Sequence, residues 1–254
     1  MPTVLMPIPN SDFDPTETAV PWKILRDQGH EVVFATPNGQ PGQADPRMLT
    51  GKGLLIFAPI LRANADALRD YGEMKQSTEF KNPISYEAMR GRTFDAMVLP
   101  GGHAPGMKEY LGSSLVQAKV AEMAQENKPI GAICHGVLVV ARARTAEGKS
   151  VLFGKKTTAL TKPLELTPWC LTRIWRGNYY RTYPETTVED EVKKNLARPQ
   201  DFDRGPFSIT RDNPKNLEAG FTVQDGCFLF ARWPGDAHRF GNEFAAMVTT
   251  GCAP

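Results

Sequence analysis

Short apolar runs alternate with longer, more mixed segments along most of the chain. The clearest runs are rich in Val, Ile, Leu and Ala and lie at residues 4–8, 31–36, 94–99 and 130–133. Continuous apolar runs of this kind, ended by turn residues, are typical of strands covered on both faces. The segments with helical character lie at 19–25, 115–126 and 137–143. This alternation predicts an α/β fold built on a parallel sheet with helices on both faces.

Residues 40–93 interrupt the alternation. They contain amphipathic stretches at 61–71 and 84–89, which we interpret as a helical insertion or cover. A length of 254 residues permits one large domain. We therefore expect a single domain over residues 1–254, with this insertion at about 40–93 and a lid segment at about 163–200.

The last third of the chain has further regular patterns. We expect a short strand at 156–160, a helix at 187–196 and a final helix at 238–248. Two apolar runs at 221–224 and 227–231 flank Asp225-Gly226, a dipeptide that favours a tight hairpin turn.

Composition and charge exclude several classes of protein. The net charge of +2 comes from 30 basic and 28 acidic residues without a basic tract, which gives nucleic-acid binding no support. No apolar run approaches the roughly 20 residues of a membrane span. The four cysteines lie far apart, without the spacing of a metal site, and the N-terminus has no signal-peptide pattern. We expect a soluble, cytoplasmic protein of a reducing compartment, with no metal and no membrane partner.

The thirteen residues from Pro129 to Ala141 carry the strongest chemical signal. A buried strand ends at Ile133, Cys134 lies at the turn, and Gly136 lets the backbone fold back into an apolar helix. Such a strand-turn-helix exposes one side chain at the carboxyl edge of a sheet, as a nucleophile elbow does. The helix dipole lowers the pKa of the thiol only in part, so we expect a mixed thiol and thiolate population and a second activating group.

The alternative for Cys134 is an ordinary buried cysteine, because free cysteines are among the most buried residues. The Gly-x-x-Cys-His-Gly arrangement between two apolar runs favours the nucleophile. The Gly-Gly pair at 101–102 is a weaker signal, because two glycines are more often just a turn. Gly101-Gly102 follows another apolar run, so it lies at the end of another strand. Since ligands of parallel sheets bind beyond the carboxyl ends of the strands, Gly102 and Cys134 are expected to line one pocket.

Four stretches together resemble the DJ-1/PfpI superfamily, and within it the Hsp31-like branch that includes glutathione-independent glyoxalases. They are residues 15–21 after the first strand, 99–103 with Gly-Gly-His, 132–136 with Cys-His-Gly, and 231–238 near the end. The resemblance spans nearly the whole chain. It implies a class I glutamine amidotransferase-like domain with a flavodoxin-like, doubly wound, mostly parallel sheet and a small cover formed by insertions.

The resemblance implies roles for five residues. It places Glu17 beside Cys134, where only a protonated carboxyl would favour a thiolate. The alternative for Glu17 is a carboxylate that stabilises a helix N-terminus. His135 would be oriented by an acid, for which Glu165 is the first candidate and Asp236 the second, although Glu165 could equally be a solvated residue at a helix start. The backbone N–H groups of Gly102 and His135 would stabilise a developing oxyanion.

The resemblance also implies a function. The first hypothesis is a cofactor-free enzyme for small reactive aldehydes, in which Cys134 adds to methylglyoxal and His135 or Glu17 transfers the proton that leads to lactate. The second is a stress-induced holding chaperone that uses the aromatic segment 169–180, whose alternative role is lid or dimer packing. A protein deglycase and a cysteine peptidase are further possibilities in the superfamily. The resemblance also implies a homodimer.

Overall fold

The computed structural model describes residues 1–252. Its central sheet has seven strands in the spatial order β5 (Ile84–Ser85), β3 (Glu31–Thr36), β1 (Thr3–Pro7), β6 (Ala96–Leu99), β7 (Ile130–Ile133), β9 (Phe228–Ala231) and β8 (Thr222–Asp225). All neighbouring strands are parallel except β8 and β9, which form an antiparallel hairpin. Two further short strands, β2 (Ser11–Phe13) and β4 (Gln43–Ala44), pair with each other. The predicted α/β fold with a mostly parallel sheet is confirmed.

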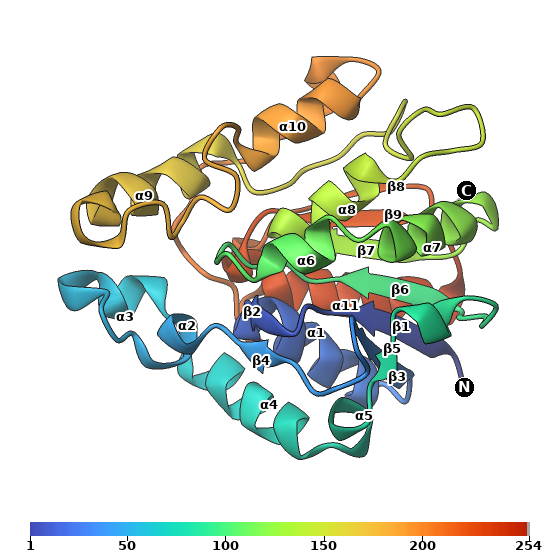
Figure 1. The fold of residues 1–254 in the computed structure, drawn as a ribbon, viewed down its shortest axis with the longest axis horizontal. Coiled ribbons are helices and arrows are strands. Elements are labelled where there is room, and N and C mark those ends of the chain that lie inside the picture. The colour runs from blue at the N-terminus through green and yellow to red at the C-terminus, as the bar shows by residue number, and fades with distance from the viewer. Residues whose placement is uncertain (253–254) are drawn as a thin grey trace.

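Helices cover both faces of this sheet. On one face α1 (Pro15–Asp27) packs against α11 (Ala237–Thr250) and α4 (Ala65–Gln76), and on the other α7 (Ser114–Gln125) packs against α8 (Val137–Arg142) (Figure 1). The remaining α-helices are α2 (Pro46–Thr50), α3 (Ala58–Leu61), α5 (Thr78–Lys81), α6 (Met107–Leu111), α9 (Lys162–Arg176) and α10 (Val188–Asn195). Every residue of β6, β7 and β9 is buried, because helices cover both faces of the sheet.

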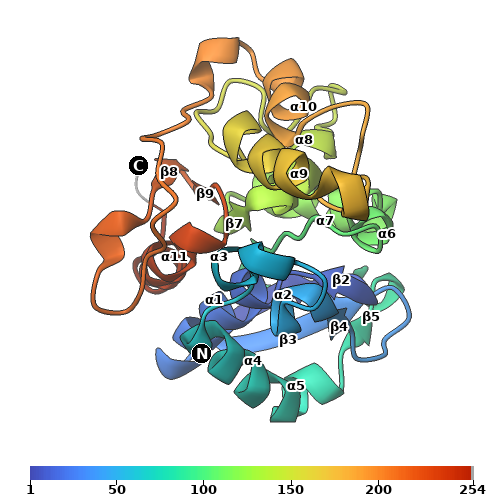
Figure 2. The same ribbon diagram turned by 90° about the vertical axis from the view of Figure 1, so that its left-hand side faces the viewer.

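Helices α2 and α3, from the expected insertion, and α9, from the expected lid segment, lie at the carboxyl edge of the sheet. Strand β6 points toward the side where α2, α3 and α9 lie (Figure 1), and Figure 2 looks onto that side. The end of α9 is tied to the insertion, because Trp175 and Arg176 both donate hydrogen bonds to the carbonyl of Gly53, at 3.2 and 2.7 Å. Tyr179 is likewise hydrogen bonded to Asp45. These contacts hold two segments that are distant in the sequence over the ends of the strands.

Two expectations about elements are wrong. Residues 156–160 form no strand: Thr157 exchanges backbone hydrogen bonds with Asp201 and Asp203, so its polar groups pair with a loop beside the sheet. The stretch 84–89 is not an amphipathic helix but the edge strand β5 followed by a single 3-10 turn, η2 (Glu87–Met89). In both places the sequence pattern is too short to distinguish the alternatives.

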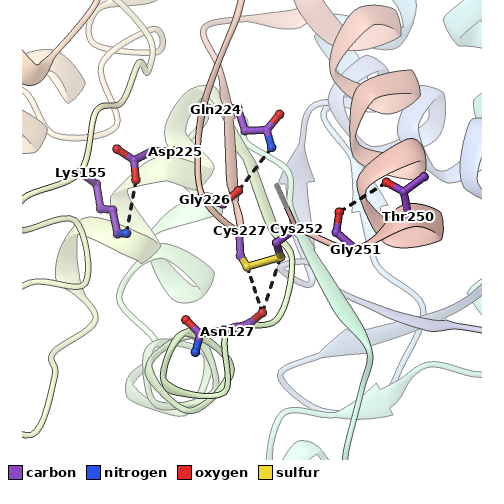
Figure 3. The surroundings of a disulfide bond; sticks show 9 residues. All are labelled: Asn127, Lys155, Gln224, Asp225, Gly226, Cys227, Thr250, Gly251 and Cys252. Atoms are coloured by element: carbon purple, nitrogen blue, oxygen red, sulfur yellow. Dashed lines mark hydrogen bonds and ion pairs between the residues drawn. A yellow bond between two sulfur atoms is a disulfide. The ribbon is translucent and has the colours of Figure 1, made fainter. Parts of the chain in front are cut away.

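A disulfide joins Cys227 to Cys252, which the sequence analysis did not anticipate (Figure 3). It fastens the chain after α11 to the start of β9, and both sulfur atoms lie close to the carbonyl oxygen of Asn127. A disulfide persists in an oxidising environment, so this pairing argues against the expectation of a reducing compartment. Within residues 1–252, no helix combines the length and the apolar character needed to cross a bilayer.

Candidate active site

Cys134 lies on a strained turn at the carboxyl end of β7. Its φ of 58° is in the left-handed region, which non-glycine residues seldom adopt and which is common at functional sites. The 3-10 turn η3 (Cys134–Gly136) then leads into α8. Gly136 is required because a Cβ atom there would overlap the carbonyl of Leu99. The turn places the thiol, which is only 4% exposed, on the wall of a cavity of about 280 Å³.

Glu17 lies in the first turn of α1 and reaches the same cavity. Helix α1 is capped by Asp14, whose carboxylate accepts the N–H groups of Thr16 and Glu17, so the cap does not require the Glu17 side chain. One oxygen of Glu17 accepts the N–H of Gly101 at 2.9 Å. The other, Oε1, has no hydrogen-bond partner among residues 1–252. Glu17 is therefore a buried site residue as well as a residue of a helix N-terminus.

The environment of Glu17 favours its protonated form. Burial raises the pKa of Glu17 well above its usual value, and the nearby carboxyl of Asp14 raises it further. The Cys134 thiol and the Gly101 N–H act in the opposite direction but do not outweigh burial. The shift is toward the protonated form of Glu17, which is the form that the resemblance implies.

The thiol of Cys134 differs from the expectation. Burial raises the pKa of Cys134 well above its usual value, and an ionised Glu17 would raise it further. The N–H of His135 lowers this pKa but is a smaller effect. This direction runs against the expected mixed thiol and thiolate population, because the helix dipole was weighed without the cost of burying the charge. As a nucleophile, Cys134 would have to lose its proton during the reaction.

His135 is the nearest group that can accept this proton. Its Nδ1 lies 3.5 Å from the Cys134 sulfur. Burial lowers the pKa of His135 to about 3, so its imidazole is neutral at working pH and has a free lone pair. A proton transfer from thiol to imidazole creates two adjacent opposite charges, which stabilise each other in a buried site.

Glu165 lies near His135, but no hydrogen bond joins the two side chains. Glu165, in the first turn of α9, lines the main cavity and also shares a small adjoining hollow with His135. Its Oε2 accepts the N–H of Val188 at 2.8 Å, and its Oε1 forms an ion pair with Arg181 at 3.1 Å, without the alignment of a hydrogen bond. Glu165 therefore fixes the lid to the segment before α10, and its role as an orienting acid remains a prediction.

The second candidate acid, Asp236, has a different role. Both of its oxygens bind the guanidinium of Arg232, at 2.8 and 2.9 Å, and they also accept the N–H groups of Phe221 and Arg232. Asp236 is fully buried and does not line the cavity. It anchors the loop after β9, and these hydrogen bonds do not reach His135.

The glycine loop after β6 closes the other side of the site. Gly101 uses its N–H to bind Glu17, and a side chain there would overlap the Glu17 carboxyl. Gly102 lines the cavity with a φ of 150°, and a Cβ atom would press on the backbone of Asp12 and Asp14. The loop thus brings Gly102 to the elbow as expected. Its role as an oxyanion donor, with the N–H of His135, stays a prediction.

Sequence reasoning gave no place in the cavity to Arg211 or His103. Arg211 is half-buried, donates to the carbonyl of Ile60 at 3.2 Å, and lowers the pKa of both Asp14 and Glu17. His103 stacks on Tyr180, with ring centroids 4.4 Å apart. His103 follows the Gly-Gly pair and could have been noticed there, whereas the irregular segment around Arg211 contains no motif. Among residues 1–252, no group of three His, Cys, Asp or Glu side chains is arranged to hold a metal ion.

Comparisons with known proteins agree with this geometry. The profile of the family described as ThiJ/PfpI family-like matches residues 8–203. The chain is 30% identical over 237 residues to deglycase TK1284 of Thermococcus kodakarensis, covering 93% of each chain. It is 26% identical over 153 residues to the glutathione-independent glyoxalase hsp3101 of Schizosaccharomyces pombe, covering 59% of each.

A solved structure supports the fold. The crystal structure of glyoxalase III from Candida albicans superposes with a TM-score of 0.67 at 17% identity, covering 96% of both chains. Most curated relatives that match are covered over less than two thirds of their own length. The similarity therefore extends over the fold more completely than over the sequence.

Proposed function

The chain belongs to the ThiJ/PfpI family of the DJ-1/PfpI superfamily, and on this basis we propose that it is a glutathione-independent glyoxalase-type enzyme. It would convert methylglyoxal to lactate through a hemithioacetal on Cys134. One observation carries the proposal: a buried cysteine on a nucleophile elbow is next to a neutral imidazole and shares its cavity with a carboxyl whose burial favours the protonated form. The similarity to the glutathione-independent glyoxalase hsp3101 and to glyoxalase III of Candida albicans supports it.

The first half of the reaction forms the carbon–sulfur bond. The Cys134 thiol gives its proton to His135 as the sulfur attacks the aldehyde carbon, and Glu17 gives its own proton to the aldehyde oxygen. The N–H groups of Gly102 and His135 would stabilise the charge that develops on that oxygen. The product is a hemithioacetal beside an ionised Glu17 and a protonated His135.

The second half moves a proton between two carbons. Ionised Glu17 removes the proton from the carbon bonded to sulfur and returns it to the neighbouring carbon. The hydroxyl proton passes at the same time to the neighbouring carbonyl oxygen, and the hemithioacetal becomes a lactyl thioester. Water then attacks the thioester, giving one proton to Glu17, while protonated His135 returns its proton to the leaving sulfur. One water is consumed, and Cys134, His135 and Glu17 regain their starting states. General acid–base catalysis of this kind contributes about 10² to 10⁴ in rate.

A lactate assay tests the proposal. The purified protein is incubated with methylglyoxal in the absence of glutathione, and lactate is measured against the methylglyoxal consumed. The proposal predicts equal amounts, with saturation kinetics. Consumption without lactate, or no reaction, would contradict it.

Deglycase activity is a second candidate, because a relative matched over 93% of its length carries that name. A deglycase uses the same nucleophile but has to admit an adducted side chain. Parallel assays on free methylglyoxal and on methylglyoxal adducts of N-acetylcysteine separate the two. Release of lactate from the adduct faster than its spontaneous dissociation would favour the deglycase. The chaperone hypothesis gains less support, because Tyr179 and Tyr180 are buried and the Trp175 indole is hydrogen bonded to the insertion.

A further inference from the structure

The cavity around Cys134 is larger and more apolar than a three-carbon dicarbonyl requires. Its volume of about 280 Å³ approaches the roughly 300 Å³ at which pockets begin to enclose drug-sized ligands. The apolar part of its wall comes from the insertion, from α9 and from the segment before β8, and includes Phe57, Leu61, Leu164, Leu171, Phe207 and Ile209. A methyl group could cover only a small part of this wall.

The cavity that Cys134 lines also contains buried hydrogen-bond donors. Arg211 Nη1, Tyr180 Oη and Trp233 Nε1 are buried and have no hydrogen-bond partner among residues 1–252. The Arg211 guanidinium lowers the pKa of Asp14, and the Asp14 carboxylate raises the pKa of Tyr180. Asp14 caps α1, the helix that carries Glu17. The Arg211 guanidinium lies over the Trp233 ring, 5.5 Å from its centre.

These unpartnered groups are donors, so they suit the oxygen atoms of a ligand. A buried donor without an acceptor is costly, which makes a ligand that supplies oxygen favourable. Most of the other lining residues are apolar, apart from Asp14, Glu17, His103, Glu165 and Thr167, and this wall favours a hydrocarbon chain. The cavity therefore combines donors for ligand oxygens with a wide apolar wall.

We propose that the preferred substrate is a 2-oxoaldehyde with an apolar side chain of several carbons, of which methylglyoxal is a short and poorer analogue. Its two oxygens lie among Arg211, Tyr180 and the glycine loop, and its side chain lies between α9 and the insertion. This inference rests on the proposed function and leaves its chemistry unchanged. The carbon–sulfur bond forms and breaks as before, one water is consumed, and the product is the corresponding 2-hydroxy acid.

A chain-length series tests the inference. Methylglyoxal, butylglyoxal and hexylglyoxal are compared by kcat/KM, measured as formation of the 2-hydroxy acid. Burial of each added methylene should raise kcat/KM by up to about fourfold until the cavity is filled. Equal values for all three substrates in an active enzyme would overturn the inference and leave the proposed function intact.

Two positions on α9 provide a matched pair of variants. Leu171 lines the cavity, whereas Ile174, one turn further along, is 90% exposed and does not. Leu171→Asn should flatten the dependence on chain length, and Ile174→Asn should preserve it. A flattened series in Ile174→Asn but not in Leu171→Asn would place the side chain elsewhere and contradict the inference.

A binding measurement separates this inference from the proposed function. If none of the three substituted glyoxals is turned over, the proposed function fails. The affinity of the cavity for non-reacting probes is then measured by calorimetry on Cys134→Ser. The probes are pyruvate and its homologue with a hexyl side chain, in which a carboxylate replaces the aldehyde beside the ketone. Affinity that rises with chain length supports the inference. Absence of binding by the longer probe overturns it.

Discussion

Glu17 and Cys134 are buried in the same cavity, and the protonation state of each determines how the reaction starts. Burial raises the pKa of both, and a protonated Glu17 removes the repulsion that would otherwise oppose a thiolate. We expect Glu17→Gln to leave the reactivity of the Cys134 thiol near pH 7 almost unchanged, because a neutral group replaces a neutral group. Turnover should fall about 10² to 10⁴-fold, since glutamine cannot carry the proton.

Iodoacetamide labelling across a pH series measures the first quantity, and lactate formation measures the second. A marked rise in thiol reactivity in Glu17→Gln would mean that Glu17 is ionised in the native protein. Glu17→Ala serves as the comparison, because it also removes the acceptor for the Gly101 N–H.

Glu165 should make stability depend on pH. Burial raises the pKa of Glu165 from 4.5 to about 7, although Val188 and Arg181 oppose the shift. Since the folded pKa lies above the unfolded value, the stability linked to this group is fully present below 4.5 and is lost as pH rises through about 7. In Glu165→Gln this loss, about 3 kcal/mol in the native protein, should disappear. Denaturant unfolding at several pH values measures the free energy of unfolding of both proteins. The same pH dependence in the native protein and in Glu165→Gln would contradict the prediction.

The elbow shows how one glycine determines the geometry of an element. Gly136 lies so close to Leu99 that an added Cβ has no room, whereas Gly72 in α4 is exposed with open space around it. We expect Gly136→Ala to reduce the free energy of unfolding by about 3 kcal/mol. Gly72→Ala should raise it by about 0.5 to 1 kcal/mol, because alanine favours a helix. Thermal unfolding of both variants provides the test. Equal changes in the free energy of unfolding would contradict the close contact between Gly136 and Leu99.

The Cys227–Cys252 disulfide closes a loop with a sequence separation of 25 residues. Cys252→Ser or chemical reduction should lower the free energy of unfolding by about 3 kcal/mol. Catalysis should be unaffected, because Cys227 pairs with the start of β7 whereas Cys134 follows its end. Unfolding with and without reductant tests this. Identical transitions in both conditions would mean that the pair is not bonded in solution.

The sequence predicted elements well where hydrophobic pattern and turn signal agreed. The hairpin around Asp225-Gly226 and the final helix are both present, because local turn geometry and an amphipathic face specify them. The disulfide and the loop at 156–160 were not predictable, because they depend on which distant segments meet. The candidate site divides in the same way. Cys134, Glu17 and Gly102 follow from motifs, whereas Arg211 reaches the cavity only through tertiary packing.

At the scale of the whole molecule, the sheet edge collects residues from the whole length of the chain. Glu17, Cys134, Glu165 and Arg211 come from four separate segments and line one cavity beneath the lid. The homodimer implied by the resemblance remains a prediction. Sedimentation analysis should give twice the chain mass of 28.0 kDa, and a mass equal to one chain at micromolar concentration would contradict it.

The central claim is that Cys134 is the nucleophile of a glyoxalase-type reaction. The most direct test compares lactate formation by Cys134→Ser and Cys170→Ser, because Cys170 is the exposed free cysteine of the chain and Cys134 the buried one. Cys134→Ser should lower the rate at least about a hundredfold while the free energy of unfolding changes by only about 1 kcal/mol. Cys170→Ser should match the native protein in both measurements. An unchanged rate of lactate formation in a folded Cys134→Ser protein would contradict the account.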